Sequence, residues 1–124
     1  MRQLVSHKVN GCNEELEVTA IDQPGHGNAC HEYLISAPAN PGKSDGVYCS
    51  VKFQNGGIAL VGTNGVTHEA LLAILQDRLE GFQSGPFACA DNQEALDAIK
   101  KAQECLQRRT KARLARGVEG THTV

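Results

Sequence analysis

The stretch THEALLAILQDRLEGFQ, residues 67–83, contains the pattern that decides the fold. Thr67 is a favourable N-cap residue, and Glu69 in the first turn complements the positive end of the helix dipole. The residues Ser84, Gly85 and Pro86 cannot continue a helix, so the helix should end close to them. Its apolar side chains recur at the three- and four-residue intervals of one helix face: Leu71, Ile74, Leu75, Leu79 and Phe82.

A second helix is predicted after this bend. Asp91, followed by Glu94 three positions later, resembles a capping box. Gly117 is a natural helix stop, because glycine adopts the left-handed conformation readily. Two helices joined by a loop of about ten residues should pack antiparallel, so a helical hairpin is expected. An inward stripe runs along the second helix: Leu96, Ile99, Ala102, Leu106 and Thr110.

The N-terminal half has a different period and short β-type runs. Alternation of apolar and polar residues over 47–53 predicts a half-buried strand, and the residues Asn55 and Gly56 after it favour a hairpin turn. Further strands are predicted over residues 16–21, 33–36 and 58–61. The sequence therefore predicts an α+β fold, with a small antiparallel β region over 1–64 and a helical hairpin with a C-terminal tail over 65–124. We expect the two parts to form one compact ligand-binding unit.

Composition argues against several classes of protein. No run of about 18 apolar residues occurs, so no membrane span is expected. The first 18 residues contain no continuous apolar stretch, so we expect no secretory signal. Five widely spaced cysteines without a CxxC motif are typical of reduced thiols, which favours a cytoplasmic protein.

The chain also lacks the usual signatures of catalysis. No GxSxG, HExxH or P-loop motif is present. His26, Cys30 and His31 are possible metal ligands, but they do not follow zinc-site spacing. We therefore expect no catalytic residue, no metal and no cofactor, and a binding protein in place of an enzyme.

Positive charge is concentrated near the C-terminus. Residues 100–116 contain seven of the twelve Lys and Arg residues, although the net charge of the chain is −2. Arg109 and Arg113 are four residues apart, so both project from one helix face and could clamp a pyrophosphate. The alternative is a basic face that only contacts solvent. A local basic surface on a mildly acidic protein suggests a focused anion site.

Phe82 and Asn92 flank the bend between the two helices. Phe82 could stack on a nucleobase, and the amide of Asn92 could bond to a base or ribose edge. The alternatives are a core phenylalanine and a helix-capping asparagine. Seventeen residues separate Asn92 from Arg109, which is roughly 25 Å along a helix. One small nucleotide could touch both ends only if a second chain ran in reverse, as in a two-fold homodimer with two equivalent pockets.

Three motifs together resemble a known family: NGVTHEALL at 64–72, FQSGPFA at 82–88 and RGVEGTH at 116–122. They resemble the phage Thoeris anti-defence sponges over about residues 47–124. The helical half is also similar to the hairpin of the phage anti-CBASS sponges. The resemblance implies a non-catalytic protein that acts in the host bacterial cytoplasm.

The resemblance also implies a ligand, which is glycocyclic ADP-ribose, the signal made by Thoeris TIR-domain proteins. Phe82, Asn92, Arg109 and Arg113 occupy positions at which family members contact it. Some relatives form hexamers and bind cyclic oligonucleotides in a separate pocket. Two alternatives remain open, which are a phosphodiesterase-like enzyme that degrades the signal and an RNA- or DNA-binding module that uses the basic helix. We expect no nucleic acid polymer as partner.

Overall fold

The computed structural model describes residues 1–37 and 46–121. These residues form two compact units. The first unit contains residues 1–56 with 63–65, and the second contains residues 57–62 with the chain from residue 66 onward. The strands lie in the first unit and the long helices in the second, so the predicted α+β fold is confirmed.

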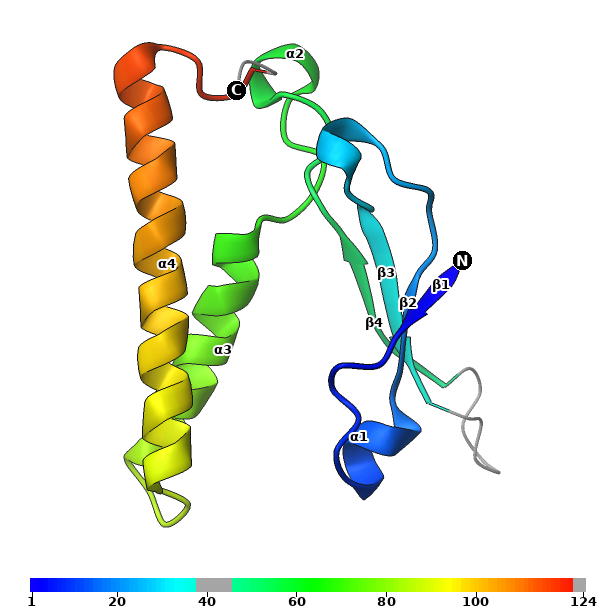
Figure 1. The fold of residues 1–124 in the computed structure, drawn as a ribbon, viewed down its shortest axis with the longest axis vertical. Helices are drawn as coiled ribbons and strands as arrows, with labels where there is room; N and C mark the ends of the chain where they lie inside the picture. The colour runs from blue at the N-terminus through cyan, green and yellow to red at the C-terminus, as the bar shows by residue number, and fades with distance from the viewer. Residues whose placement is uncertain (38–45, 122–124) are drawn as a thin grey trace. The chain divides into compact units, whose positions relative to one another are not determined.

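The first unit is a single antiparallel sheet with the strand order β1-β2-β3-β4 (Figure 1). Its strands are β1 (Arg2–Leu4), β2 (Glu17–Ala20), β3 (Glu32–Ser36) and β4 (Val47–Lys52). The register places Val18 opposite Ile35 and Ala20 opposite Tyr33, so apolar side chains share one face. Two short helices connect the strands, α1 (Gly11–Glu15) and the 3₁₀ helix η1 (His26–Asn28). β1 and α1 are not predicted by the sequence pattern.

The predicted strand over residues 58–61 is wrong, because these residues form a short helix, α2 (Ile58–Val61). Backbone bonds to the Gly57 carbonyl oxygen, from the N–H groups of Leu60 and Val61, close its turn. An apolar run of four residues fits either structure by periodicity alone. The predicted hairpin turn at Asn55 and Gly56 is therefore wrong as well, since no strand follows it.

Side chains hold the chain together on either side of α2. The backbone N–H of Asn55 donates to Oδ1 of Asn64 at 2.8 Å, and Nδ2 of Asn64 donates back to the carbonyl oxygen of Asn55 at 2.7 Å. Gly65 lies so close to Phe53 that a Cβ atom there would be 2.4 Å from the Phe53 carbonyl carbon. Asn55 and Asn64 thus join the two segments of the first unit that flank α2.

The second unit is built on the helical hairpin of α3 (His68–Gln83) and α4 (Ala90–Arg116). The predicted N-cap of α3 is confirmed, since Oγ1 of Thr67 accepts a bond from the backbone N–H of Ala70 at 3.1 Å. The predicted capping box of the second helix is wrong, because Cys89 is the N-cap of α4 and its Sγ accepts from the backbone N–H of Asn92. Asp91 lies within the first turn, where its charge still complements the helix dipole.

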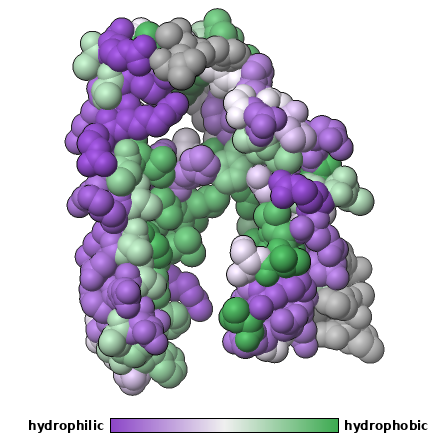
Figure 2. Space-filling model, in the orientation of Figure 1, coloured by the Kyte–Doolittle hydropathy of each residue, from purple (hydrophilic) through white to green (hydrophobic). Residues whose placement is uncertain are grey.

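The predicted stripe of α4 turns inward, with Leu96 buried and Ile99, Ala102, Leu106 and Thr110 half-buried. The stripe of α3 is only partly covered, because Ile74 is 64% exposed and Leu75 is 48% exposed. Figure 2 shows hydrophobic surface along the visible side of α3. The second unit therefore leaves part of an apolar helix face without cover.

Helix α4 is longer than α3, with 27 residues against 16, and its C-terminal part runs past the start of α3 (Figure 1). A Schellman motif ends it at Gly117, whose φ is 72°, with Val118 N–H bonded to the carbonyl oxygen of Arg113. The tail then meets α2, where the backbone N–H of Ala59 donates to the Gly120 carbonyl oxygen at 3.0 Å. The described tail ends at Thr121, so His122 of the RGVEGTH motif lies outside it.

Candidate functional site

The structure brings Phe82 and Asn92 to the same end of the hairpin. Nδ2 of Asn92 donates to the carbonyl oxygen of Phe87 at 3.3 Å. The ring of Phe87 meets the ring of Phe82 edge to face, with centroids 5.9 Å apart and planes at 77°. Asn92 therefore supports the bend through its side chain, and both predicted residues are half-buried there.

Gln83 fixes the conformation of this bend. Its Nε2 donates to the Cys89 carbonyl oxygen at 3.1 Å, and its Oε1 accepts from the Cys89 backbone N–H at 3.0 Å. Ser84 adds a bond from Oγ to the carbonyl oxygen of Gly81 at 2.7 Å. These bonds hold the segment between the helices in one shape, so a ligand would meet a preformed surface.

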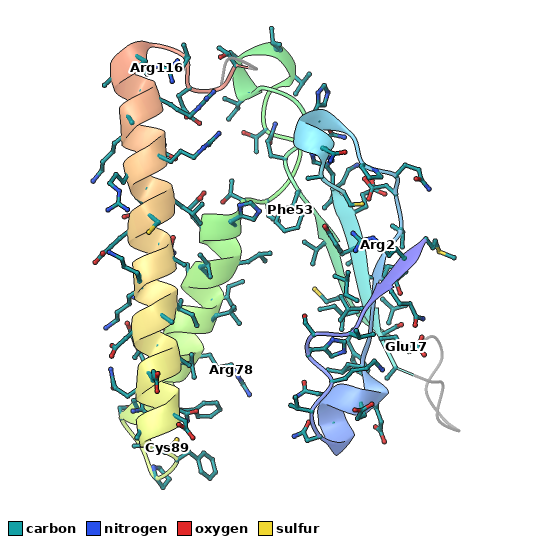
Figure 3. All side chains as sticks on the ribbon, viewed as in Figure 1. Arg2, Glu17, Phe53, Arg78, Cys89 and Arg116 are labelled. Atoms are coloured by element: carbon teal, nitrogen blue, oxygen red, sulfur yellow. The ribbon has the colours of Figure 1, made fainter. Side chains whose placement is uncertain are left out.

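Arg78 is a member of this cluster that the sequence analysis does not single out. Its guanidinium lies over the ring of Phe82, with Cζ 4.8 Å from the ring centroid, which is cation–π geometry. The spacing of four residues between Arg78 and Phe82 is the signal that could have indicated it, because such pairs share a helix face. Figure 3 shows Arg78 and Cys89 near the bend and Arg116 at the opposite end of α4.

Arg109 and Arg113 lie toward that opposite end, but they have different environments. Arg109 is exposed, whereas Arg113 is only 7% exposed. Nε of Arg113 is 3.0 Å from Oε2 of Glu119, and Nη2 donates to the carbonyl oxygens of Val118 at 3.0 Å and Thr121 at 3.2 Å. Arg113 thus ties the tail to α4, and the alternative of a solvated basic face does not describe it.

The two ends of the hairpin are far apart within one chain. Seventeen helical residues between Asn92 and Arg109 correspond to roughly 25 Å, and both positions lie on the single helix α4. Nε2 of Gln103 donates to the Glu69 carbonyl oxygen at 3.0 Å, so the start of α3 lies beside the middle of α4. The aromatic cluster and the arginines are therefore two separated candidate half-sites within the second unit.

Two of the possible metal ligands, Cys30 and His31, form hydrogen bonds with Asp22 in the first unit. The Asp22 carboxylate accepts from the backbone N–H groups of His31 at 2.8 Å and Glu32 at 3.1 Å, and the bond from His31 lowers the pKa of that carboxyl below its usual range. Sγ of Cys30 donates to the carbonyl oxygen of Asp22. Across residues 1–37 and 46–121, no three His, Cys, Asp or Glu side chains are grouped to hold a metal ion.

Within the same described ranges, no helix combines the length and the apolar character that crossing a membrane would require. The longest helix, α4, is 27 residues long but contains many charged side chains. The candidate site consists of two parts. One is the group at the bend, with Phe82, Phe87, Asn92 and Arg78, and the other is the end of α4 that contains Arg109 and Arg113.

Known proteins resemble the part of the chain that contains this site. A family model described as the Acb2/Tad1 hairpin domain matches residues 46–111, which is more than half of the chain. Over 77 residues the chain is also 42% identical to Thoeris anti-defense 1 of Bacillus phage SBSphiJ7. That alignment covers 62% of this chain and 54% of the phage protein, so the chain spans about half the length of this relative. The family match includes Phe82, Asn92 and Arg109, and it ends two residues before Arg113.

Proposed function

The chain belongs to the Acb2/Tad1 hairpin family, and from this premise we propose that it is an anti-defence sponge. It binds a cyclic nucleotide signal, glycocyclic ADP-ribose, without cleaving it and so prevents activation of the Thoeris effector. The similarity to Thoeris anti-defense 1 supports the anti-Thoeris role. The protein would act in the cytoplasm of the infected bacterium, where the signal is made.

The observation that carries this proposal is the division of the hairpin into an aromatic half-site and a cationic half-site. Phe82 and Asn92 offer a ring and an amide for the adenine and ribose. Arg109 is exposed and offers a charged donor for a pyrophosphate. Arg113 lies one turn further along α4, where it adds positive charge and holds the tail. Glycocyclic ADP-ribose is a compact cycle of one adenine, two riboses and a pyrophosphate, so it presents a partner for each of these side chains.

A homodimer joins the two half-sites. Because they lie roughly 25 Å apart in one chain, a second chain in the reverse direction must bring its arginine end beside the bend of the first. The uncovered residues Ile74 and Leu75 on α3 supply an apolar surface for such a contact. A two-fold axis then generates two identical pockets.

The strength of binding also favours an enclosed pocket. A sponge must compete with an effector, so it needs nanomolar affinity or better, about −12 kcal/mol. Charge-assisted hydrogen bonds contribute about 1.5–3 kcal/mol each and base stacking about 1–3 kcal/mol. Association opposes them by at least about 4 kcal/mol. Arg109 alone in open water would not suffice, whereas several desolvated contacts from two chains would.

The direct test is calorimetric titration of the protein with glycocyclic ADP-ribose, followed by heating of the complex. We expect nanomolar binding and full recovery of intact ligand from the denatured sample. Loss of the ligand would support the alternative of a degrading enzyme. Binding of single-stranded RNA with a steep salt dependence, in place of the small ligand, would support the nucleic-acid alternative.

Two variants of neighbouring arginines test the assigned site. Arg109→Ala should weaken binding by at least about 10-fold, the equivalent of one charge-assisted contact. Arg108→Ala removes the same charge from the same turn and should change Kd by no more than about threefold. Equal losses in the two variants would mean that only the general charge of the helix attracts the ligand.

The dimer is tested separately by sedimentation. Ile74→Asp places a carboxylate on the uncovered face of α3 and should yield a monomer with little affinity for the ligand. A monomeric species that still binds at nanomolar concentration would contradict the composite pocket. A larger wild-type species, such as a hexamer, would be compatible with it if each dimer within it binds two ligands.

A further inference from the structure

The rings at the bend do not offer equal surfaces to a ligand. One face of the Phe82 ring is covered by the guanidinium of Arg78, at 4.8 Å from the centroid, and the ring also contacts Phe87. Phe87 is 70% exposed, which is unusual for a large apolar side chain. The open aromatic face at this end of the hairpin therefore belongs to Phe87.

Arg78 adds a positive charge to the bend. Among the residues that the structure describes, no carboxylate forms an ion pair with it within 4.0 Å. Its guanidinium contacts the ring of Phe82, and this planar group has five donors for acceptor atoms of a ligand. Arg78 and Phe87 both contact the ring of Phe82, and a cation and an open ring at the same bend suit a flat heterocycle whose edge carries hydrogen-bond acceptors, as a purine does.

We propose that Phe87 is the stacking surface for the purine base and that Arg78 donates hydrogen bonds to the edge of that base. This inference rests on the proposed function and refines its aromatic half-site. Phe82 then acts as a positioning residue, because it holds both Phe87 and Arg78 in place. Rings at 77° form a corner, so a base lying flat on Phe87 meets Phe82 edge-on.

The test compares Phe87→Ala, Phe87→Leu and Phe87→Tyr by calorimetry with glycocyclic ADP-ribose. We expect Kd to rise about 10- to 100-fold for alanine and leucine, which lack a ring, and to stay near the wild-type value for tyrosine. The free energy of unfolding in urea should fall by no more than about 1.5 kcal/mol in all three, because the Phe87 ring is mostly exposed and its edge contact with Phe82 is the packing at stake. Leu60→Ala is the control, since Leu60 is 71% exposed on α2 and should not affect affinity.

A second readout reports stacking itself. The adenine protons of the bound ligand should shift upfield in the proton NMR spectrum of the wild-type complex, and this shift should vanish with Phe87→Leu. Arg78→Met keeps an aliphatic chain over Phe82 but removes the donors, so it should raise Kd about 10-fold and leave the upfield shift in place.

Three results would overturn the inference. Wild-type affinity of Phe87→Ala would leave the proposed function intact and remove Phe87 from the site. A smaller species of Phe87→Ala in sedimentation would identify the ring as a subunit contact. Failure of the wild-type protein to bind glycocyclic ADP-ribose at all would refute the proposed function itself, and the stacking assignment with it.

Discussion

Replacement of Glu119 by glutamine tests whether Arg113 stabilises the C-terminal tail through a charged pair. The carboxylate is 3.0 Å from Nε of Arg113, a guanidinium that is only 7% exposed. Glutamine has nearly the same shape and keeps an oxygen that can accept the hydrogen bond. The substitution thus removes the countercharge of Arg113 and leaves most of the packing unchanged.

The expected loss in the free energy of unfolding depends on how deeply Arg113 and Glu119 are each buried. Removal of one partner from a fully buried ion pair costs about 3–5 kcal/mol. The Glu119 side chain is 34% exposed, so water screens part of the interaction, and glutamine retains a hydrogen bond. We expect a loss of about 1–2 kcal/mol in the free energy of unfolding, which lowers Tm by roughly 4–12 °C in a domain of this size.

The assay is urea and thermal unfolding of wild type, Glu119→Gln and Glu104→Gln at equal protein concentration. Glu104 pairs with Lys101 on the exposed face of α4, where both side chains are 66% exposed, so its replacement should cost less than about 0.5 kcal/mol. Equal midpoints for the two variants would refute the reasoning, because the buried pair would then contribute no more than a surface pair.

Three further predictions concern other positions. Gly57→Ala places a Cβ 2.3 Å from the Gly120 carbonyl oxygen and should lower the free energy of unfolding by about 1–3 kcal/mol. Gly81→Ala, whose Cβ meets nothing within 4 Å, should raise that free energy by about 0.5–1 kcal/mol, so similar urea midpoints for the two variants would contradict this prediction. The folded state lowers the pKa of Asp22, so the stability that its carboxylate contributes is present above the unfolded value of 3.8 and is lost as pH falls through the folded value. In Asp22→Asn this pH-dependent loss of stability should disappear from acid unfolding followed by circular dichroism, and the same acid unfolding curve as in wild type would contradict the prediction. Cys89→Ser should raise the stability of the hairpin by up to about 1 kcal/mol in urea unfolding, because oxygen accepts the N-cap bond better than sulfur, and a lower midpoint would show that Sγ has another role.

The helices could be predicted because local chemistry determines their ends. Thr67 and Gly117 act at the positions where their side chain or backbone favours a helix end, independently of the remaining fold. The start of α4 could not be placed by the same rule. Cysteine is not among the preferred N-cap residues, so Asp91 and Glu94 offered the better pattern, while the bonds of Gln83 to Cys89 decided the actual start.

The β region was harder to predict because pairing partners are distant in sequence. β1 is three residues long, and only its pairing with β2 identifies it as a strand. The run Ile58–Val61 illustrates the opposite error, because four apolar residues satisfy the strand pattern. Its helical state depends on turns at Gly57 and Gly62 and on contact with the tail at Gly120.

The candidate site shows the same limit at the level of single side chains. The spacing of four residues predicts that Arg109 and Arg113 project from one helix face, but spacing contains no information on burial. The clustering of cations there also has a purely structural reason, because Arg113 and Arg116 lie in the last turn of α4 and offset the negative end of its dipole. Charge count alone therefore cannot separate a ligand site from helix stabilisation. What separates them is the partner of each guanidinium. Arg113 already has Glu119 and two carbonyl oxygens, whereas among the described residues no carboxylate lies within 4.0 Å of Arg109 or Arg78 as an ion-pair partner. Cations whose charge the protein has not yet compensated have donors left for a ligand, which is why we assign the pyrophosphate to Arg109 and the edge of the base to Arg78.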